Sequence, residues 1–268
     1  MNSEPKTSRP FTPFLTCLPL ALVLAFAAPT PARALGDWVG VEGSIWRNNQ
    51  DGQASIDGDT FGGTTFDFQD TIDLEKSDSS KMGRVWFKLG KTRLVFDYLD
   101  SSREGSKTLT QSFFFDDTAY LATEDVDSRL NLKLLQAQLR FTLADLKIVD
   151  VGVGFGLNQA QVDMVMDGSI NGRSELDEKI PYPTLAAAVT IKPMPGFHIR
   201  AEANGLKVNV RGTRVNVLDT RLQVEMYIAH VLGFFAGYRN YRFDAVDEDF
   251  GSIENTFKGP YAGIGVKF

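Results

Sequence analysis

Apolar and polar residues alternate over two long segments of this chain. Residues 149–158 (VDVGVGFGLN) carry an apolar side chain at every second position, and residues 218–228 (LDTRLQVEMYI) do so with one exception, Thr220. A period of two places successive side chains on opposite faces of an extended strand, whereas a helix needs a period near 3.6. These segments therefore predict strands with one apolar and one polar face.

Similar segments recur throughout residues 35–268, and clusters of Gly, Asp, Asn and Pro separate them. No stretch has the period of an amphipathic helix, and no repeat of about 20–50 residues is present. No internal run reaches the roughly 18 apolar residues that a membrane-spanning helix requires. We therefore predict an all-β chain, and its length suits one barrel or sandwich domain.

Residues 1–34 have the composition of a cleaved secretory signal peptide. A positive start is followed by an apolar middle at residues 14–28, and Ala32 and Ala34 frame an A-x-A cleavage pattern. The apolar run is shorter than the roughly 20 residues of a spanning helix and is interrupted by Pro19. We expect export with cleavage after Ala34, which leaves residues 35–268 as the mature domain. The only cysteine, Cys17, would be removed with the signal peptide.

The connections between the predicted strands are tight at one end and long at the other. Tight turns are expected near residues 90, 144, 195 and 232, with a short connection at Gly212-Thr213 on the opposite side. Membrane barrels show this asymmetry, with short periplasmic turns and long external loops. We predict a transmembrane antiparallel up-and-down β-barrel of about ten strands, with eight or twelve as alternatives. The long external loops are expected at residues 48–80, 105–123, 163–181 and 244–256.

The last strand supports a membrane barrel over a soluble one. The chain ends in YAGIGVKF, in which Tyr261, Gly263, Val266 and Phe268 form a pattern of polar, glycine, hydrophobic and terminal aromatic residues. This pattern resembles the C-terminal signature of Gram-negative bacterial outer-membrane β-barrels. The resemblance implies a place in the outer membrane, among its lipid and lipopolysaccharide. It also implies the barrel assembly machinery and periplasmic chaperones as partners, and Tyr261, Gly263, Val266 and Phe268 as the assembly signal.

Negative charge is concentrated in the four expected loops. In chain order they carry net charges of −7, −1, −3 and −5, while the whole chain carries −6. The remainder of the mature domain is therefore basic. Acidic loops exclude nucleic acid as a partner, because its phosphates would be repelled. Lipopolysaccharide phosphates could approach them only through bridging divalent cations.

No metal or cofactor site is predicted. The loop 48–80 is rich in aspartate, but Phe61 occupies the third ligand position after Asp57 and Asp59 in the calcium-loop pattern. The glycines of residues 152–156 lack the following helix that a dinucleotide-binding loop needs. They are interpreted as positions facing the interior of a narrow barrel.

No catalytic set is visible either. The chain has two histidines, His198 and His230, both beside turns expected on the periplasmic side. Similarity to the ten-stranded omptin-type proteases therefore ends at strand number, and the triplet at 198–200 lacks the nucleophile of lipid A deacylase barrels. We expect a non-enzymatic barrel acting as a narrow pore, a surface-binding protein or a structural component. Two alternatives remain: an enzyme acting on lipid A or surface peptides at the loop rim, and a soluble periplasmic β-sandwich binding module.

The interior of a ten-stranded barrel is expected to be largely filled by side chains, because eight strands leave an interior just wide enough for them. With Gly212-Thr213 as a two-residue turn, Arg200 falls opposite Glu225, and a three-residue turn at 231–233 places Arg239 on the other side of Glu225. We therefore predict a charged row Arg200–Glu225–Arg239 inside the barrel. Further polar lumen residues are expected to be His198, Glu202, Asn204, Arg221, Gln223 and Tyr227.

Overall fold

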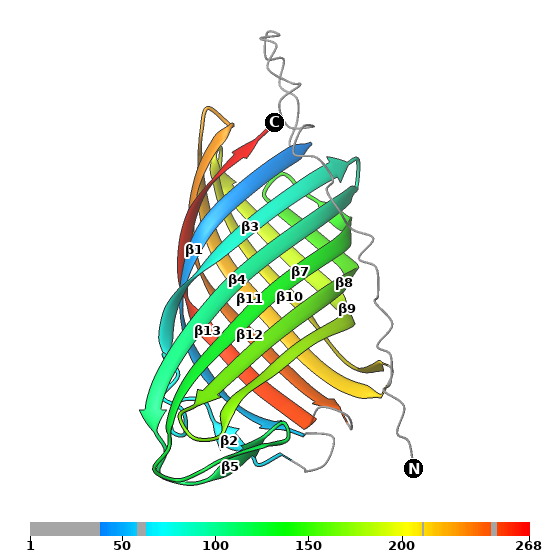
Figure 1. Cartoon of the computed structure of the whole chain (residues 1–268). Helices are drawn as coiled ribbons and strands as arrows, with labels where there is room; N and C mark the ends of the chain where they lie inside the picture. Colours follow the sequence, from blue (N-terminus) through cyan, green and yellow to red (C-terminus); the bar gives the residue numbers. More distant parts are fainter. Residues whose placement is uncertain (1–37, 58–62, 211, 248–250) are drawn as a thin grey trace, which may run out of the picture. The chain divides into compact units, whose positions relative to one another are not determined.

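Ten antiparallel strands close into a barrel (Figure 1), as the alternation of the sequence predicts. The computed structural model describes residues 38–57, 63–210, 212–247 and 251–268, so the expected signal peptide and its cleavage site at Ala32 and Ala34 lie outside the described residues. The chain divides into residues 1–35 and 36–268, and everything below concerns the second unit. No helix among the described residues is long and apolar enough to cross a membrane.

The strands of the barrel are long. Each pairs with the next barrel strand along the chain, if the short strands in the loops are left out of the order. They are β1 (Val39–Ile56), β3 (Ser77–Leu89), β4 (Thr92–Thr108), β7 (Asp125–Asp145), β8 (Val149–Gly168), β9 (Gly172–Met194), β10 (Phe197–Val210), β11 (Thr213–Ile228), β12 (Leu232–Asp247) and β13 (Gly251–Lys267). Three short strands lie in the loops: β2 (Phe66–Asp67), β5 (Phe113–Phe115) and β6 (Thr118–Tyr120).

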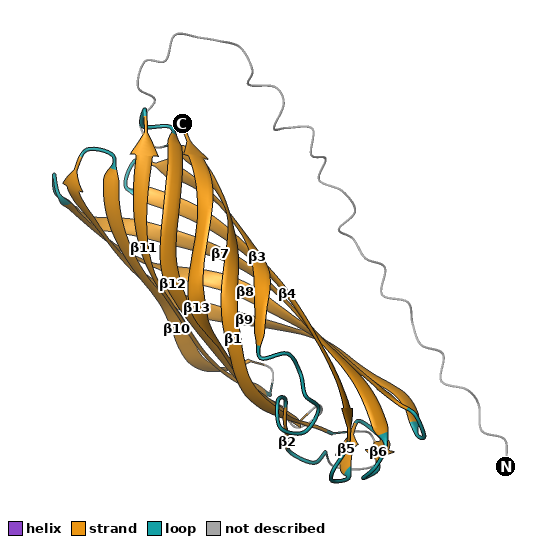
Figure 2. Ribbon diagram, turned by 90° about the vertical axis from the view of Figure 1, so that its left-hand side faces the viewer, coloured by secondary structure: helices purple, strands orange, loops and turns teal. Residues whose placement is uncertain are grey.

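The barrel closes where its first strand meets its last. β1 pairs with β13 over most of its length, from Gly40 opposite Lys267 to Ile56 opposite Gly251. The Phe268 N–H donates to the Val39 carbonyl at 2.8 Å, and the Phe268 carbonyl accepts from Trp38 at 2.8 Å. The last residue of the chain is thus part of the seam. We call this end of the barrel, which also holds four tight turns, the turn end, and the opposite end the loop end (Figure 2).

Deleting Phe268 should lower the yield of assembled barrel several-fold. The deletion removes three backbone hydrogen bonds of the seam and the terminal aromatic residue of the expected assembly signal. The measurement is the fraction of protein that migrates faster on a gel before heating than after it. Phe268→Tyr, which keeps the backbone and an aromatic ring, is the matched control. An unchanged folded fraction in the deletion would refute the expectation.

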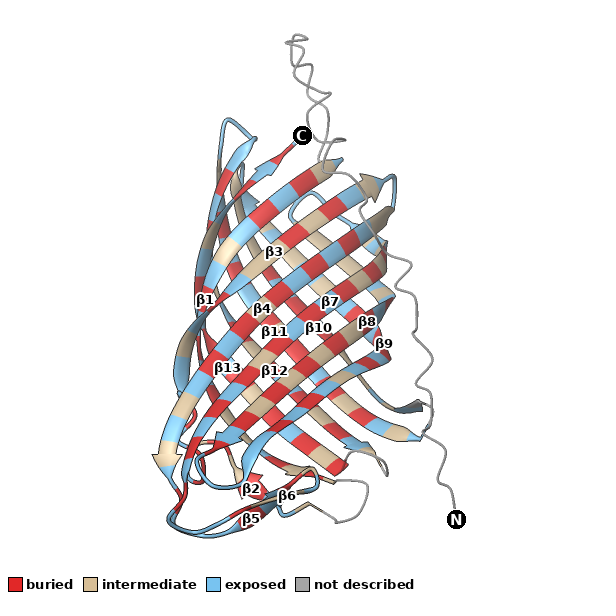
Figure 3. Ribbon diagram, in the orientation of Figure 1, coloured by how far each residue is buried: buried red, intermediate tan, exposed pale blue. Residues whose placement is uncertain are grey.

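The outer wall of the barrel changes polarity along its length. Near the turn end, exposed side chains are large and apolar, for example Leu135 and Phe141 on β7 and Phe155 on β8. Nearer the loop end, the same faces carry Arg129 and Asp163. Figure 3 shows the alternation of buried and exposed residues continuing along the strands through both zones. The barrel therefore has an apolar belt at the turn end and a polar wall at the loop end.

The interior changes in the opposite sense. On β7, the buried residues nearest the turn end are Gln138 and Arg140, whereas Leu130 and Leu132 are buried toward the loop end. The change falls at the pair Leu134 and Leu135, one buried and one exposed. In the half nearer the loop end, the barrel is thus built like a water-soluble protein, with an apolar core and a polar surface.

This inversion corrects two of the expected loops. Residues 163–181 belong to β8 and β9, whose turn comprises only residues 169–171 because Gly168 pairs with Gly172. Residues 244–256 likewise belong mostly to β12 and β13, which pair up to Asp247 and Gly251. The expected loops 48–80 and 105–123 also lose their ends to strands, since β1 continues to Ile56 and β4 to Thr108. The polar composition of residues 163–181 and 244–256 predicts loops, but most of these residues form strands whose outer face is polar.

Candidate functional site

A balanced set of charges fills the part of the lumen nearer the turn end. Its members are all buried, and they comprise five arginines and five carboxylates. They are Arg84, Arg140, Arg200, Arg221, Arg239, Glu42, Asp97, Glu202, Asp219 and Glu225. Buried charges are tolerated when each is paired and hydrogen-bonded. The equal numbers make this possible here, and we call the set the charged layer.

Glu202 on β10 connects opposite sides of the charged layer. Its carboxylate lies 2.7 Å from Arg84 Nη2 on β3 and 2.6 Å from Arg140 Nη1 on β7. Arg84 also pairs with Asp97 on β4 at 2.8 Å, and Asp97 accepts from Arg221 on β11 at 2.9 Å. Five strands are therefore joined through the interior of the barrel, which a water-filled pore would not allow.

The spaces left within this half of the lumen are small. Three cavities bordered by the charged layer measure about 20, 50 and 30 Å³. A cavity needs about 10–15 Å³ of such space to hold one water, so each of these cavities holds a few waters.

The predicted row Arg200–Glu225–Arg239 is only half present. Arg200 Nη2 and Glu225 Oε1 are 2.8 Å apart, but Arg239 pairs with Asp219, with two contacts of 2.9 Å. Two registers differ from the expected ones. Val210 pairs with Thr213, so Arg200 lies opposite Gln223, and Ile228 pairs with Leu232, so Arg239 lies opposite Arg221. The first turn lies one residue earlier than expected and the second lies two residues earlier, which shifts the pairings by two and by four residues. An even shift preserves the faces, so all three side chains still point inward.

The other predicted lumen residues also lie inside the barrel. Gln223 donates to Glu225 at 3.0 Å, and the Tyr227 hydroxyl donates to Glu225 at 2.9 Å. His198 Nδ1 lies 3.6 Å from the Glu225 carboxylate. Asn204 is buried opposite Asp219. Glu225 therefore has polar contacts on its own strand and on β10, and its direct partner on β12 is Phe235 instead of the predicted Arg239.

The expected assembly signal divides between the two faces of β13. The Tyr261 hydroxyl donates to Gln223 at 2.7 Å inside the barrel. Gly263 also faces inward, where a Cβ would lie 2.2 Å from the Gly43 carbonyl oxygen. Val266 and Phe268 are exposed on the outer wall. Tyr261 and Gly263 thus also have packing roles in the lumen.

An apolar layer fills the lumen between the charged layer and the loop end. Several of its aromatic rings contact one another. The distance between ring centroids is 6.3 Å for Trp46 and Phe257, 6.3 Å for Phe257 and Tyr241, and 5.8 Å for Tyr182 and Phe243. Leu130, Leu132, Val162 and Met164 are buried with them. Sequence reasoning missed this layer because it assumed that apolar residues face outward along the whole strand.

The loop end is covered by a cap formed by residues 63–76 and 109–124. Phe66 of the first segment packs on Phe113 of the second with ring centroids 5.0 Å apart, and Phe113 stacks on Tyr120 at 5.5 Å. Ile72 and Phe115 are fully buried in the same core. The two-stranded sheet of β5 and β6 lies at this end of the barrel in Figure 2. The cap therefore continues the apolar layer beyond the strands.

Glu124 fastens the cap to the β8–β9 turn. Its buried carboxylate accepts hydrogen bonds from the backbone N–H groups of Leu121, Ile170 and Asn171 at 2.8–2.9 Å, and from the Asn171 amide at 3.0 Å. Burial alone raises the pKa of this carboxyl, but the hydrogen bonds from Leu121, Asn171 and Ile170 outweigh it and lower the pKa to about 2. Glu124 is therefore charged at neutral pH and holds two loops together.

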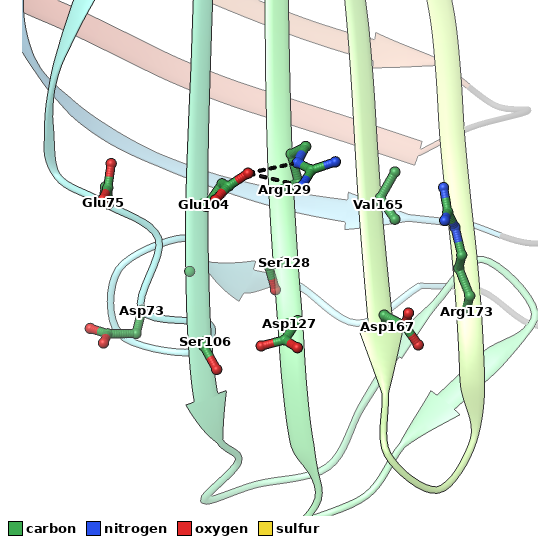
Figure 4. Close-up of a pocket in the computed structure, with 11 residues that line it drawn as sticks. Asp73, Glu75, Glu104, Ser106, Asp127, Ser128, Arg129, Val165, Asp167 and Arg173 are labelled. Atoms are coloured by element: carbon green, nitrogen blue, oxygen red, sulfur yellow. Dashed lines mark hydrogen bonds and ion pairs between the residues drawn. The ribbon is translucent and has the colours of Figure 1, made fainter.

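A groove of about 640 Å³ lies on the outer wall at the loop end (Figure 4). Strands β4, β7, β8 and β9 form its floor, and the segment preceding β3 contributes Asp73 and Glu75. Across the strands, Ser106, Asp127, Asp167 and Arg173 are direct partners in one row. Glu104 and Arg129 pair at 2.9 Å in the next row, both well exposed.

The groove is acidic and places two carboxylates directly opposite each other. Five carboxylates and two arginines line it. Asp127 and Asp167 lie directly opposite each other, an arrangement that destabilises a sheet unless a cation reduces the repulsion. Ser128 contributes to the lining, but its side chain is buried on the lumen face, between the outward-facing Asp127 and Arg129. Sequence reasoning assigned some of these residues to acidic loops but did not foresee a row across four strands.

No protein-family model matches the sequence, and no curated protein matches it. Solved structures match it in fold. The outer-membrane protease OmpT of Escherichia coli aligns with a TM-score of 0.53 at 9% identity over 87% of this chain and 97% of that one. The translocator domain of the autotransporter NalP of Neisseria meningitidis aligns with a TM-score of 0.49 at 14% identity, over 87% and 90%. At such identities the likeness concerns the fold alone: this chain has the fold of a Gram-negative outer-membrane β-barrel.

Proposed function

We propose that this protein is an integral outer-membrane barrel that does not conduct solutes and that works through its loop end. The observation that carries the proposal is the filled lumen, in which a balanced charged layer, an apolar layer and a cap follow one another. Each layer would block a diffusing solute. The closed barrel also removes the soluble β-sandwich from consideration.

The apolar belt has the height of a bilayer core. On β8 it extends from Val149 to Leu157, nine residues. At about 3.3 Å per residue and a tilt of about 40°, this corresponds to roughly 23 Å, close to the apolar band of about 25 Å in outer-membrane barrels. The polar wall would then stand outside the membrane. Short turns and termini face the periplasm in such barrels, so the loop end would face outward.

A surface-binding role without catalysis suits the loop end. His230 lies in a tight turn at the opposite end, and His198 lies in the lumen near that end, so neither can serve a rim site. The Asp67 carboxylate at the loop end accepts hydrogen bonds from the backbone N–H groups of Gln69 and Asp70 at 2.8 and 2.7 Å and thereby stabilises its own turn. The acidic groove is the surface we propose for binding, and its charge favours cationic groups of a ligand.

The purified barrel should produce no stepwise conductance in a planar lipid bilayer, because ion pairs of the charged layer bridge the lumen and leave only small spaces between them. A bacterial porin added to the same chamber serves as the positive control, and heat modification on a gel shows that the sample is folded. Regular conductance steps of porin size from the unmodified protein would disprove the proposal.

A further inference from the structure

Strand β9 loses its neighbour β10 halfway along its length. The two strands pair from Met194 opposite Phe197 to Leu185 opposite Gly205, and they diverge from there toward the loop end (Figure 1). Residues 172–184 of β9 pair with β8 alone, and no other strand among the described residues pairs with them on the far side. We call this far side of residues 173–179 the open edge.

Two prolines explain where the ladder between β9 and β10 ends. Across the β8–β9 pair, the Lys192 N–H donates to the Ile148 carbonyl at 2.8 Å. Backbone bonds alternate along an antiparallel pair, so even-numbered residues of β9 bond to β8, and odd-numbered residues direct their N–H and C=O groups to the other side. Pro181 and Pro183 are odd-numbered and have no N–H to donate to β10. The ladder therefore stops at Leu185.

Beyond the prolines, the open edge has a full set of backbone groups. Arg173, Glu175, Asp177 and Lys179 are odd-numbered and non-proline, so each directs both an N–H and a C=O away from β8. Seven residues extend over about 23 Å at 3.3 Å per residue. The apolar belt reaches only as far as Leu185 on this strand, so the open edge belongs to the polar wall. Such an edge is a template for another extended segment.

A second copy of the barrel does not fit the open edge. Two barrels inserted in the same orientation are related by an axis along the membrane normal. Strands tilted by about 40° from that normal would then cross at about 80°, which allows neither a parallel nor an antiparallel ladder. The segment that pairs with the open edge must therefore be a flexible or extended part of a different protein.

The outer face of the open edge determines the charges of a matching segment. Its side chains are in order basic, acidic, acidic and basic: Arg173, Glu175, Asp177 and Lys179. Asp177 also lies directly opposite Asp163 of β8, and a cation on an added strand would reduce this repulsion. Residues directly opposite each other share a face, so a complementary strand presents acidic, basic, basic and acidic side chains there.

The inner face favours apolar residues. Leu176 and Ile180 of β9 are buried in the apolar layer, and Val208 near the end of β10 is partly buried against the same core. Side chains of an added strand alternate between the two faces. Every second residue of the segment would thus lie beside apolar side chains of the barrel.

We propose that the open edge binds an extended peptide segment of another protein by strand addition. In this segment apolar residues alternate with charged ones, and the two central charged residues are basic. The segment pairs antiparallel with residues 173–179, as all neighbouring strands of the barrel pair. The inference rests on the binding role proposed for the loop end, for which it names a class of partner, but it uses the edge of β9 and not the acidic groove.

Two labelled peptides of equal composition test the charge pattern. The peptide EVKVKVE matches residues 173–179, whereas KVEVEVK reverses every charge. Fluorescence anisotropy is recorded with the folded barrel in nonionic detergent at low ionic strength. We expect saturable binding of one EVKVKVE per barrel, and binding of KVEVEVK at least about tenfold weaker, because like charges then lie opposite each other. The absence of saturable EVKVKVE binding at millimolar concentration, or equal affinity of the two peptides, would overturn the proposal.

Methylated peptides test the backbone pairing. In an antiparallel ladder with the odd-numbered residues of β9, the charged residues of EVKVKVE donate their N–H groups to the barrel, and the valines direct theirs away. N-methylation of the two lysines should therefore abolish binding, and N-methylation of two valines should leave most of it. Equal loss with both peptides would overturn strand addition.

Lys179→Pro is the matching change in the barrel. It removes one N–H from the open edge and leaves the bonds to β8 intact, as Pro181 and Pro183 do, and it should weaken EVKVKVE binding about tenfold. Asp127→Asn, in the acidic groove two strands away, should leave the affinity unchanged. Heat modification on a gel confirms that each variant is folded. Weaker binding in Asp127→Asn with unchanged binding in Lys179→Pro would place the peptide in the groove, which overturns this inference and leaves the proposed function standing.

Discussion

Replacing Glu202 with alanine should destabilise the barrel by about 3–5 kcal/mol, the usual cost of breaking a buried ion pair from one side. The carboxylate is the shared partner of Arg84 and Arg140, and its removal leaves two buried guanidinium groups facing each other across the lumen. The same change should produce a small ion leak in planar bilayers, selective for anions, because the strongest bridge across the charged layer is lost. Urea unfolding in lipid vesicles measures the first effect and single-channel recording the second.

Glu175→Ala is the matched control for this change. Glu175 pairs with Arg173 at 3.1 Å, but both side chains are at least half exposed, and exposed pairs contribute about 0–1 kcal/mol. Glu202→Gln keeps the size of the side chain and should give an intermediate loss. If Glu202→Ala were no more destabilised than Glu175→Ala, the charged layer would not be a structural plug.

Replacing Glu124 with alanine should detach the cap from the β8–β9 turn. Four hydrogen bonds to one buried carboxylate are lost, and three of their donors are backbone N–H groups. Hydrogen bonds to charged groups contribute about 1.5–3 kcal/mol each, so local stability should fall by several kcal/mol while the barrel persists. Hydrogen exchange of peptides covering residues 109–124 and 168–172 should accelerate at least about tenfold. Unchanged exchange in these peptides would refute the role of Glu124.

The same carboxylate predicts a pH dependence. Its pKa is lowered from 4.5 to about 2 in the folded protein, because the hydrogen bonds from Leu121, Asn171 and Ile170 outweigh the opposing effect of burial. A lowered pKa means that the stabilisation is complete above pH 4.5 and is lost as the pH falls through about 2. Protection of the cap, corrected for intrinsic exchange rates, should therefore persist at pH 4 and decline near pH 2. Glu124→Gln should show weak protection at every pH and no such decline.

The fold could be predicted from the sequence because a period of two determines both strand and face. Strand number, antiparallel order and the closing seam follow from alternation and turn residues, and ten strands were expected. The length of the strands beyond the apolar belt could not be predicted by the same reasoning. Residues 163–181 and 244–256 alternate as the other strands do, but with polar residues outward, and this polarity was interpreted as loop. The adjacent pair Leu134-Leu135 is the local signal of the inversion.

The sequence predicts which side chains face the lumen, but it does not predict which residues they pair with there. Arg200, Glu225 and Arg239 all face the lumen as expected, because register errors of two and four residues leave faces unchanged. Their partners depend on the turns, and the β10–β11 and β11–β12 turns lie one and two residues earlier than expected. Contacts across the lumen, such as Glu202 with Arg84, join residues that are 118 positions apart in the chain. No local pattern specifies them, because they depend on which strands face each other once the barrel has closed.

A single-cysteine accessibility scan tests the account most directly, since the only cysteine of the sequence lies in the expected signal peptide. Cysteines are placed one at a time at the outward-facing Asp163 and Leu157 and at the inward-facing Val162 of β8, in protein folded in lipid vesicles. A water-soluble maleimide should react rapidly at 163 and slowly at 157, where only a lipophilic reagent should react. Neither reagent should react readily at 162. Rapid reaction of the water-soluble reagent at 162 would mean that the lumen is a water-filled pore, and the sealed barrel would be wrong.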